Sequence, residues 1–406
     1  FLTPLPAPAG PVHEITLDNG MEVLVREDHR APVVVSQVWY RVGASYEHGG
    51  VTGISHMLEH MMFKGTERHA PGEFSRLVAA AGGEDNAFTS RDYTAYYQKL
   101  AADRLELALR LEADRMRGLL LDPEEFRRER SVVTEERRQR TEDNPQSLAW
   151  EEFMAAAFRA GPYRQPVIGW MGDIQSYRVA DLRDWYRRWY APNNAILVVA
   201  GDVDPERVHE LARRHFGPIE PSPPAEAKPR PEPPQRGERR ITVRAPASLP
   251  LVIMGYKAPS VGQAAEPWEP YALAVLASVL DGGQSARLAR ELVRGAEVAA
   301  SASASYRVYR RLPGLLTLAG LPAQGRTAAA VEEALHAQVR RLREEPVPAR
   351  ELERVKTQVV ASEVYDKDSV FYQAMRLGML EAIGLDWRLD EEYVPRIRAV
   401  NPEQVQ

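Results

Sequence analysis

A proline-rich segment interrupts the chain near its middle and restricts its fold more than any other feature of the sequence. Eight prolines occur in the seventeen residues from Pro218 to Pro234, within GPIEPSPPAEAKPRPEPPQRGERR at 217–240. Because proline lacks a backbone N–H and has a fixed φ, this density excludes helix and paired strand and favours an extended, semi-rigid linker. We therefore expect a first domain at 11–216, a linker at 217–240 and a second domain at 241–406.

Both parts of the chain mix strand-like and helix-like patterns. Strands are expected at 22–26, 33–42, 195–200, 241–243 and 251–257. Helices are expected around 54–62, at 179–190 and 205–216, and from Trp268 and Ser285. A further helix should start at Asp122-Pro123, a strong capping signal, and continue past Glu136 toward Asn144. Because the two parts also begin alike, the sequence predicts a degenerate duplication of an α+β unit.

Composition limits the chemistry that the chain can carry. It has 406 residues and no cysteine, which excludes disulfides, thiol nucleophiles and every cysteine-containing metal site. Any metal must therefore be bound by His, Asp and Glu. Lys and Arg number 52 against 57 Asp and Glu, and this net charge of -5 gives no reason to expect a nucleic-acid partner.

No apolar run is long enough to span a membrane. The longest, Tyr271 to Leu280, has about half the length that a transmembrane helix needs. The first ten residues, FLTPLPAPAG, contain the small-x-small triplet Ala7-Pro8-Ala9, which fits the end of a processed signal sequence as well as a loop. We expect a soluble protein without a membrane span, located in the cytoplasm or the periplasm.

Two histidines flank a glutamate in GISHMLEH at 53–60, as His56, Glu59 and His60. On a helix, side chains four residues apart share a face, so both imidazoles can reach one metal ion, with Glu59 beside them. The opposite face is apolar and consists of Ile54, Met57, Leu58, Met61 and Met62. The alternative is an amphipathic helix with two histidines and no metal. It leaves two imidazoles and an acid on the polar side without a packing role.

A catalytic zinc typically takes three protein ligands, so a third ligand must come from elsewhere in the chain. The helix from Pro123 offers one, because Phe126, Glu129, Val133 and Glu136 form a single stripe. Glu136 is the predicted third ligand, whereas Glu135 is turned by about 100° and should face water. In isolation these acids could equally be solvated residues of a charged helix.

With Glu136 placed 76 residues after His60, the pattern resembles the inverted zinc motif of the pitrilysin superfamily, which includes insulin-degrading enzyme and mitochondrial processing peptidase. The resemblance extends over nearly the whole chain. It includes LDNGMEVLV (17–25), EHMMFKGT (59–66), GGEDNAFTSRDYTAYY (82–97), GPYRQPVIG (161–169), YAPNNAILVVAGDVD (190–204) and DGGQSARL (281–288). The chain is most similar to the short bacterial subunits that are close to mitochondrial processing peptidase.

The resemblance implies a zinc metalloendopeptidase with an α+β fold. Its two homologous domains would each be an antiparallel-rich sheet flanked by helices, and together they would form half of a clamshell. One Zn²⁺ would be bound by His56, His60 and Glu136, although such a site can also accept manganese or cobalt. Glu59 would act as the general base, and Glu129 would orient the site from behind the ligands.

The resemblance also implies a substrate strand. Asn86, Ala87 and Phe88 match the edge strand on which the family lays its substrate by backbone pairing, a mode that selects extended, unfolded peptides. From the residues alone, this segment could equally be an ordinary strand beside a turn.

One pair of family residues is missing. Complete members carry an Arg and, seven residues later, a Tyr that reach the facing half and help to stabilise the oxyanion. Val293 and Ala300 stand at these positions, and Arg294 and Tyr306 are the nearest substitutes. The resemblance therefore implies a heterodimer in which a related subunit supplies the pair and this chain supplies the zinc.

Two other functions stay open at this point. The superfamily also contains scaffold subunits that have lost catalysis, but these usually lose part of the metal motif, which is complete here. A metal-dependent hydrolase of non-peptide substrates would use the same site. The cleavage preference and the physiological substrate do not follow from the sequence.

Overall fold

The computed structural model describes residues 10–223 and 227–406, so the triplet Ala7-Pro8-Ala9 lies outside the described residues. The chain forms two compact units. The first comprises the described parts of Phe1–Arg138 and Ala160–Pro231 together with Asp366–Trp387, and the second comprises Gln139–Arg159, Glu232–Tyr365 and Arg388–Gln406. Each unit thus includes a segment from the other half of the sequence, whereas the expected domains, 11–216 and 241–406, are contiguous.

The first unit is built on a six-stranded sheet with the order β1-β2-β6-β3-β5-β4. Its strands are β1 (Val12–Thr16), β2 (Glu22–Glu27), β3 (Val33–Tyr40), β4 (Glu84–Thr89), β5 (Thr94–Ala101) and β6 (Ala195–Gly201). All neighbouring pairs are antiparallel except β2 and β6, which are parallel. Strand β4 pairs with β5 alone, so among the described residues its other edge is free.

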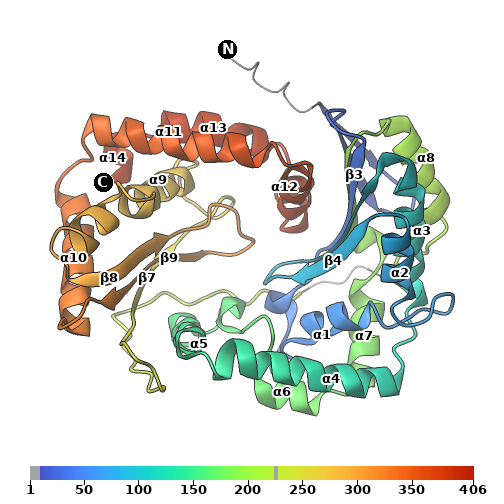
Figure 1. Ribbon diagram of the computed structural model, residues 1–406, viewed down its shortest axis with the longest axis horizontal. Coiled ribbons are helices and arrows are strands. Elements are labelled where there is room, and N and C mark those ends of the chain that lie inside the picture. Colours follow the sequence, from blue (N-terminus) through green and yellow to red (C-terminus); the bar gives the residue numbers. More distant parts are fainter. Residues whose placement is uncertain (1–9, 224–226) are drawn as a thin grey trace. The chain divides into compact units, whose positions relative to one another are not determined.

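Helices cover both faces of this sheet (Figure 1). They are α1 (Ile54–Met61), α2 (Glu73–Ala80), α3 (Leu105–Gly118), α4 (Pro123–Arg137), α6 (Met171–Ser176), α7 (Val179–Trp189), α8 (Pro205–Phe216) and α12 (Val370–Ala382). Alternate residues of β3 contact different layers: Val34 and Val38 pack in the core shared with α1, whereas Val35 and Trp39 pack against α12. Because both faces are covered, β6 reads as a continuous apolar run in the sequence, and the apolar run of β3 is interrupted only by the buried Ser36 and Gln37.

The second unit contains a three-stranded antiparallel sheet with the order β7-β9-β8. Its strands are β7 (Val252–Ala258), β8 (Ala299–Ser305) and β9 (Gly314–Pro322). Its helices are α5 (Pro145–Ala157), α9 (Glu269–Asp281), α10 (Ala328–Glu344), α11 (Ala349–Asp366), α13 (Leu389–Ala399) and α14 (Pro402–Val405). With sheets flanked by helices in both units, the predicted α+β fold is confirmed.

The segments exchanged between the halves explain why the units are discontinuous. Helix α12 comes from the C-terminal part of the chain, yet Ala374 and Leu377 are buried against the first sheet. Helix α5 comes from the N-terminal part, and Asn144 starts it by accepting hydrogen bonds from the N–H groups of Gln146 and Ser147. Helix α5 packs on β7 of the second unit. For α12, burial of an apolar face, not chain order, therefore decides that the helix belongs to the first sheet.

One expected strand of the second half is absent, and one expected helix is of a different type. The stretch 241–243 is not a strand and pairs with no strand among the described residues. The preceding residues contact helices: Arg239 Nη1 donates to Ala156 O at 3.0 Å, and Arg240 forms an ion pair with Glu332 of α10. The helix expected from Ser285 is a short π-helix, Leu288–Val293. Intrinsic strand preference without a partner strand does not create a strand.

Among the described residues, no helix is both long and apolar enough to cross a bilayer.

Candidate metal centre

Helix α1 carries the paired histidines, and buried groups hold its first turn. The carboxylate of Glu47 accepts hydrogen bonds from the backbone N–H groups of Gly53 at 2.6 Å and Ser55 at 2.9 Å. These N–H groups have no partner within the helix, so the buried carboxylate caps them. Burial raises the pKa of Glu47 to about 7, although both backbone hydrogen bonds oppose this shift. The start of α1 is therefore fixed by Glu47, which lies six residues before the N-cap residue Gly53.

A close crossing of two backbones also fixes this end of α1. Gly53 has φ +83° and Gly169 has φ +88°. A Cβ atom on Gly53 would lie 2.2 Å from Ile168 O, and one on Gly169 would lie 2.1 Å from Thr52 O. Only glycine tolerates both the left-handed backbone and this approach. The segment 161–169, noted in the sequence for its family likeness, therefore packs directly against the start of the metal helix.

Helix α4 brings the acidic residues to α1. As the sequence predicts, Asp122 caps it, accepting from the N–H groups of Glu124 and Glu125. Glu129 is buried and the side chain of Glu136 is 15% exposed, whereas that of Glu135 is 55% exposed and pairs with Arg138. The helical stripe thus separates the inward acids from the outward one, as expected.

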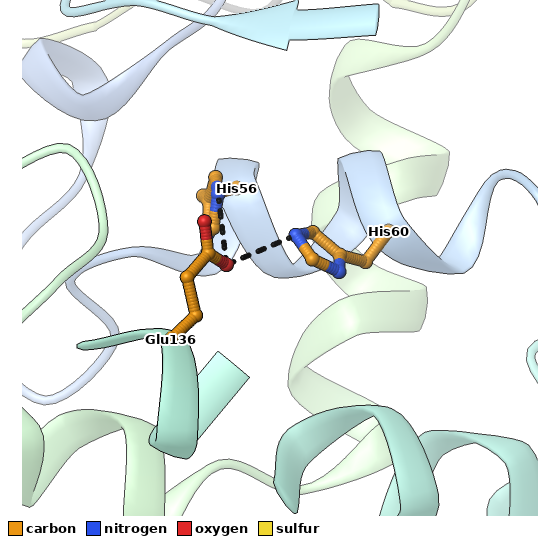
Figure 2. A group of neighbouring side chains, drawn as sticks. All are labelled: His56, His60 and Glu136. Carbon is orange, nitrogen blue, oxygen red and sulfur yellow. Dashed lines mark ion pairs between the residues drawn. The ribbon is translucent and has the colours of Figure 1, made fainter. Parts of the chain in front are cut away.

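The three predicted ligands converge (Figure 2). Oε2 of Glu136 lies 3.4 Å from His60 Nε2 and 3.8 Å from His56 Nε2, and the three ligand atoms lie within 4.8 Å of one another. Two ligand atoms of a tetrahedral zinc with bonds of about 2.0–2.1 Å lie roughly 3.4 Å apart. Two imidazole nitrogens and one carboxylate oxygen are also a donor set that suits zinc. These residues therefore fit a zinc ion with only small adjustments.

A chain of charged groups lies behind His60. Its Nδ1 is 2.8 Å from Glu129 Oε1, and Glu129 Oε2 is 2.6 Å from Lys64 Nζ. Although burial opposes it, hydrogen bonds from His60 and Lys64 lower the pKa of Glu129. Burial also disfavours a charged His60, but Glu129 and Glu136 outweigh it and raise the pKa of His60 to about 9. With Nδ1 bound to Glu129, Nε2 is the nitrogen that faces the cluster, as a metal ligand requires.

Glu59 lies next to the cluster and contacts the edge strand. Its Oε2 accepts a hydrogen bond of 2.5 Å from the hydroxyl of Thr89, the last residue of β4. Burial raises the pKa of Glu59, against the opposing effect of Thr89 and His60. A carboxylate with a raised pKa beside a metal cluster has the property that a general base needs.

The predicted substrate strand is an edge strand, and its residues face different ways. Asn86 is exposed, and Ala87 packs toward the core that contains α1. Phe88 points to the opposite face, where its ring lies 5.4 Å from that of Trp39 and packs in the α12 layer. The side chain of Phe88 is therefore not directed at the candidate metal centre, which leaves the strand backbone as the surface available for pairing.

The positions expected for the missing Arg/Tyr pair lie in the second unit. Val293 ends the π-helix and Ala300 lies in β8. Both nearby substitutes are engaged within this unit: Arg294 binds Gln284, and the hydroxyl of Tyr306 donates to Pro259 O. Neither side chain therefore extends freely from its own unit.

Three polar residues of this centre escaped the sequence analysis: Glu47, Lys64 and Thr89. Lys64 lies four residues after His60 within EHMMFKGT (59–66), and Thr89 follows Phe88 within GGEDNAFTSRDYTAYY (82–97), so both lie inside segments that resemble the family. Glu47 carried no signal, because a capping carboxylate six residues before its helix follows no local pattern.

Two family models match the chain. The model described as Insulinase (Peptidase family M16) matches residues 22–170, which include the candidate ligands His56, His60 and Glu136. The model described as Peptidase M16 inactive domain matches residues 176–359.

Known proteins show the same likeness. Zinc protease PqqE from Helicobacter pylori is 38% identical over 298 residues, which cover 72% of this chain and 66% of that protein. The crystal structure of a protease from Helicobacter pylori shares the fold with a TM-score of 0.92 at 29% identity, over 98% of this chain and 95% of that one. The periplasmic protease PqqL from Escherichia coli shares the fold at 18% identity, with a TM-score of 0.76, over 98% of this chain and 46% of PqqL. The chain therefore belongs to the insulinase family, peptidase family M16, as the zinc motif at 56–60 predicted.

Proposed function

We propose that this chain is a zinc metalloendopeptidase that hydrolyses unfolded peptides, and that it acts as the catalytic subunit of a heterodimer. The observation that carries the proposal is the convergence of His56, His60 and Glu136 beside Glu59. The name of the Helicobacter pylori relative, a zinc protease, supports the same chemistry. His56, His60 and Glu136 would hold the metal, and Glu129 and Lys64 would orient His60.

Zinc, when bound, lowers the pKa of a water molecule and polarises a peptide carbonyl. The residues of the chain perform the proton transfers. Glu59 accepts a proton as the water oxygen bonds to the carbonyl carbon, and it then donates this proton to the nitrogen of the leaving amine as the C–N bond breaks. The products are a free carboxyl and a free amine, so one side chain serves as base and then as acid.

The free edge of β4 supports an extended peptide as substrate. Backbone N–H and C=O groups of an edge strand can pair with an added strand, which binds any unfolded segment with little regard to its side chains. Because β4 ends at Thr89, which contacts Glu59, a peptide paired with this edge would pass next to the general base. The backbone around Asn86, Ala87 and Phe88 would bind the substrate.

The heterodimer rests on the residues that this chain lacks. Val293 and Ala300 stand where an Arg and a Tyr are expected, and both nearby candidates bind groups of their own unit. This chain also spans 46% of PqqL, so the fold occurs in a protein about twice as long. A related subunit would supply the Arg/Tyr pair and close a chamber around the peptide.

Substitution of Glu59 tests the chemistry. With the partner present, Glu59→Gln should retain zinc while cleavage of an unfolded fluorogenic peptide falls by about 10²- to 10⁴-fold, the usual contribution of a general base. His60→Ala should lose both zinc and cleavage, and Glu135→Gln, on the exposed side of α4 beside Glu136, should lose neither. Normal cleavage by Glu59→Gln would refute the assignment of the base.

Copurification from the native source tests the heterodimer. The chain alone should cleave the peptide poorly, and addition of the related subunit should raise the rate. Full activity of the isolated chain would refute the heterodimer and leave the peptidase intact. A zinc-free chain that assembles with a partner without cleaving peptides would instead indicate a scaffold subunit.

A further inference from the structure

We propose that Thr89 is a positioning residue that aims the carboxylate of Glu59, so that the edge strand and the general base are set in place together. This inference rests on the proposed function and adds a residue to it. The observation is the 2.5 Å hydrogen bond from the Thr89 hydroxyl to Glu59 Oε2. It joins residues that lie 30 positions apart in the chain.

The direction of the Thr89 side chain follows from the strand. Side chains alternate between the two faces of a β-strand, so Thr89 shares a face with Ala87 and not with Phe88. Ala87 packs toward the core that contains α1, whereas Phe88 packs in the α12 layer. The hydroxyl of Thr89 therefore points at α1 because of the alternation of side chains along β4.

A glutamate needs such a partner to act as a base. Its side chain has three rotatable bonds, and proton transfer requires one carboxylate oxygen within about 2.6–3.2 Å of the reacting water. The Thr89 hydroxyl holds Oε2, and a backbone hydrogen bond from the same residue also contacts this carboxylate. Precise placement of a catalytic group depends on contacts of this kind.

A purely structural role for Thr89 would make a different prediction. A second hydroxyl–carboxylate bond joins a helix to the same strand at its other end, where Ser75 Oγ of α2 donates to Asp85 Oδ2 at 2.7 Å. If hydrogen bonds between the helices and β4 mattered only for stability, removal of either bond would have similar effects. If Thr89 aims the base, only removal of its hydroxyl affects the rate of the chemical step.

The experiment compares three variants of the zinc-loaded chain in the presence of its partner. Thr89→Val replaces the hydroxyl by a methyl group of similar size, Thr89→Ser keeps the hydroxyl, and Ser75→Ala removes the bond at the other end of β4. For Thr89→Val we expect kcat to fall about 10- to 100-fold, part of the general-base contribution. Its KM should stay within about twofold, because ground-state binding is unaffected. Thr89→Ser should restore most of kcat, and Ser75→Ala should not change it.

Two further measurements do not depend on turnover. Metal analysis should give the same zinc content for all variants. Crystal structures should show the Glu59 carboxylate bonded to residue 89 in Thr89→Ser and turned away in Thr89→Val.

Wild-type kcat in Thr89→Val, together with an unmoved Glu59, would overturn the inference. Equal losses of kcat in all three variants would also overturn it, in favour of a structural role. If the wild-type protein itself shows no zinc-dependent cleavage, the proposed function fails, and the crystal structures of the two Thr89 variants still decide whether Thr89 sets the position of Glu59.

Discussion

Among the described residues, each compact unit has an edge strand that pairs on one side only, β4 in the first unit and β7 in the second, but only β4 contacts the helix that carries the two candidate histidine ligands. In the first unit, β4 ends in a hydrogen bond to Glu59 on the metal helix. In the second, β7 pairs with β9 alone, and its Lys257 pairs with Glu232 and lies over the ring of Phe158. Among the described residues, the one group that could hold a metal lies in the first unit. Similar layered folds thus bring the three candidate metal ligands together in the first unit, whereas the described residues of the second unit form no such group.

The units also differ in the partners of two carboxylates, the buried Glu47 and the partly buried Glu351. Glu47 of the first unit accepts hydrogen bonds from the backbone N–H groups of Gly53 and Ser55, whereas Glu351 of the second binds the guanidinium of Arg287 at 2.7 Å. Burial raises the pKa of Glu47 to about 7. Burial also opposes ionisation of Glu351, but Arg287 outweighs it and lowers the pKa of that carboxyl. The carboxyl of Glu47 therefore resists ionisation beside α1, whereas the ionised form of Glu351 is stabilised by Arg287.

The largest expected effect separates the units by metal binding. His60→Ala should lower zinc affinity by more than about 100-fold, the upper loss for a residue that only touches a ligand. The control is His336→Ala on α10 of the second unit, where His336 lies 3.9 Å from Glu332 in a similar histidine–carboxylate pair. Zinc content after dialysis should fall to near zero in the first variant and stay unchanged in the second. Zinc loss from His336→Ala would contradict the assignment of the site to the first unit.

A smaller effect concerns the backbone crossing at the start of α1. Gly53→Ala places a Cβ atom 2.2 Å from Ile168 O in a left-handed backbone, so the free energy of unfolding should fall by about 3 kcal/mol or more. Gly283 of the second unit also has a positive φ, +101°, but a Cβ atom there would meet nothing within 4 Å. Gly283→Ala should therefore cost only about 1 kcal/mol. If urea unfolding showed equal losses of unfolding free energy for Gly53→Ala and Gly283→Ala, the close approach of Ile168 would add nothing to the cost of the positive φ.

The smallest effect is a dependence of stability on pH. The pKa of Glu47 in the folded protein, about 7, lies above the ordinary glutamate value of 4.5, so the stabilisation by its neutral carboxyl is fully present below about pH 4.5 and is lost as the pH rises through 7. Wild-type stability relative to Glu47→Gln should therefore fall by about 1–3 kcal/mol between pH 5 and pH 8 in zinc-free protein. The nearby Asp173 adds to the shift because it disfavours a second negative charge.

Glu351→Gln is the matched control for this dependence. The pKa of Glu351 is lowered, so its stabilising ionised form is present throughout pH 5–8 and is lost only as the pH falls through the folded pKa. The difference from wild type should therefore stay constant over this window. Urea unfolding at several pH values measures both variants, and a flat difference for Glu47→Gln would show that Glu47 does not resist ionisation.

The elements that the sequence predicted well are those with strong local signals. Asp122 capped the predicted helix, and the helices at 179–190 and 205–216 and the strand at 195–200 are present within one or two residues of the expected bounds. The π-helix at 288–293 and the missing strand at 241–243 depend on neighbouring elements instead. A strand needs a partner to pair with, and no local pattern identifies that partner.

The candidate ligands of the metal centre were visible in the sequence because of helical spacing. This spacing puts His56 and His60 on one face of α1, and it puts Glu129 and Glu136 on one face of α4. Only the tertiary structure decided which groups surround them. Glu47 caps the metal helix, Lys64 holds Glu129, and Thr89 reaches Glu59 from the edge strand. The tertiary structure also decided that α12 belongs to the first sheet and α5 to the second unit. The physical reason is that periodicity acts over one or two helical turns, whereas burial and hydrogen bonding join residues at any separation once the apolar faces have packed.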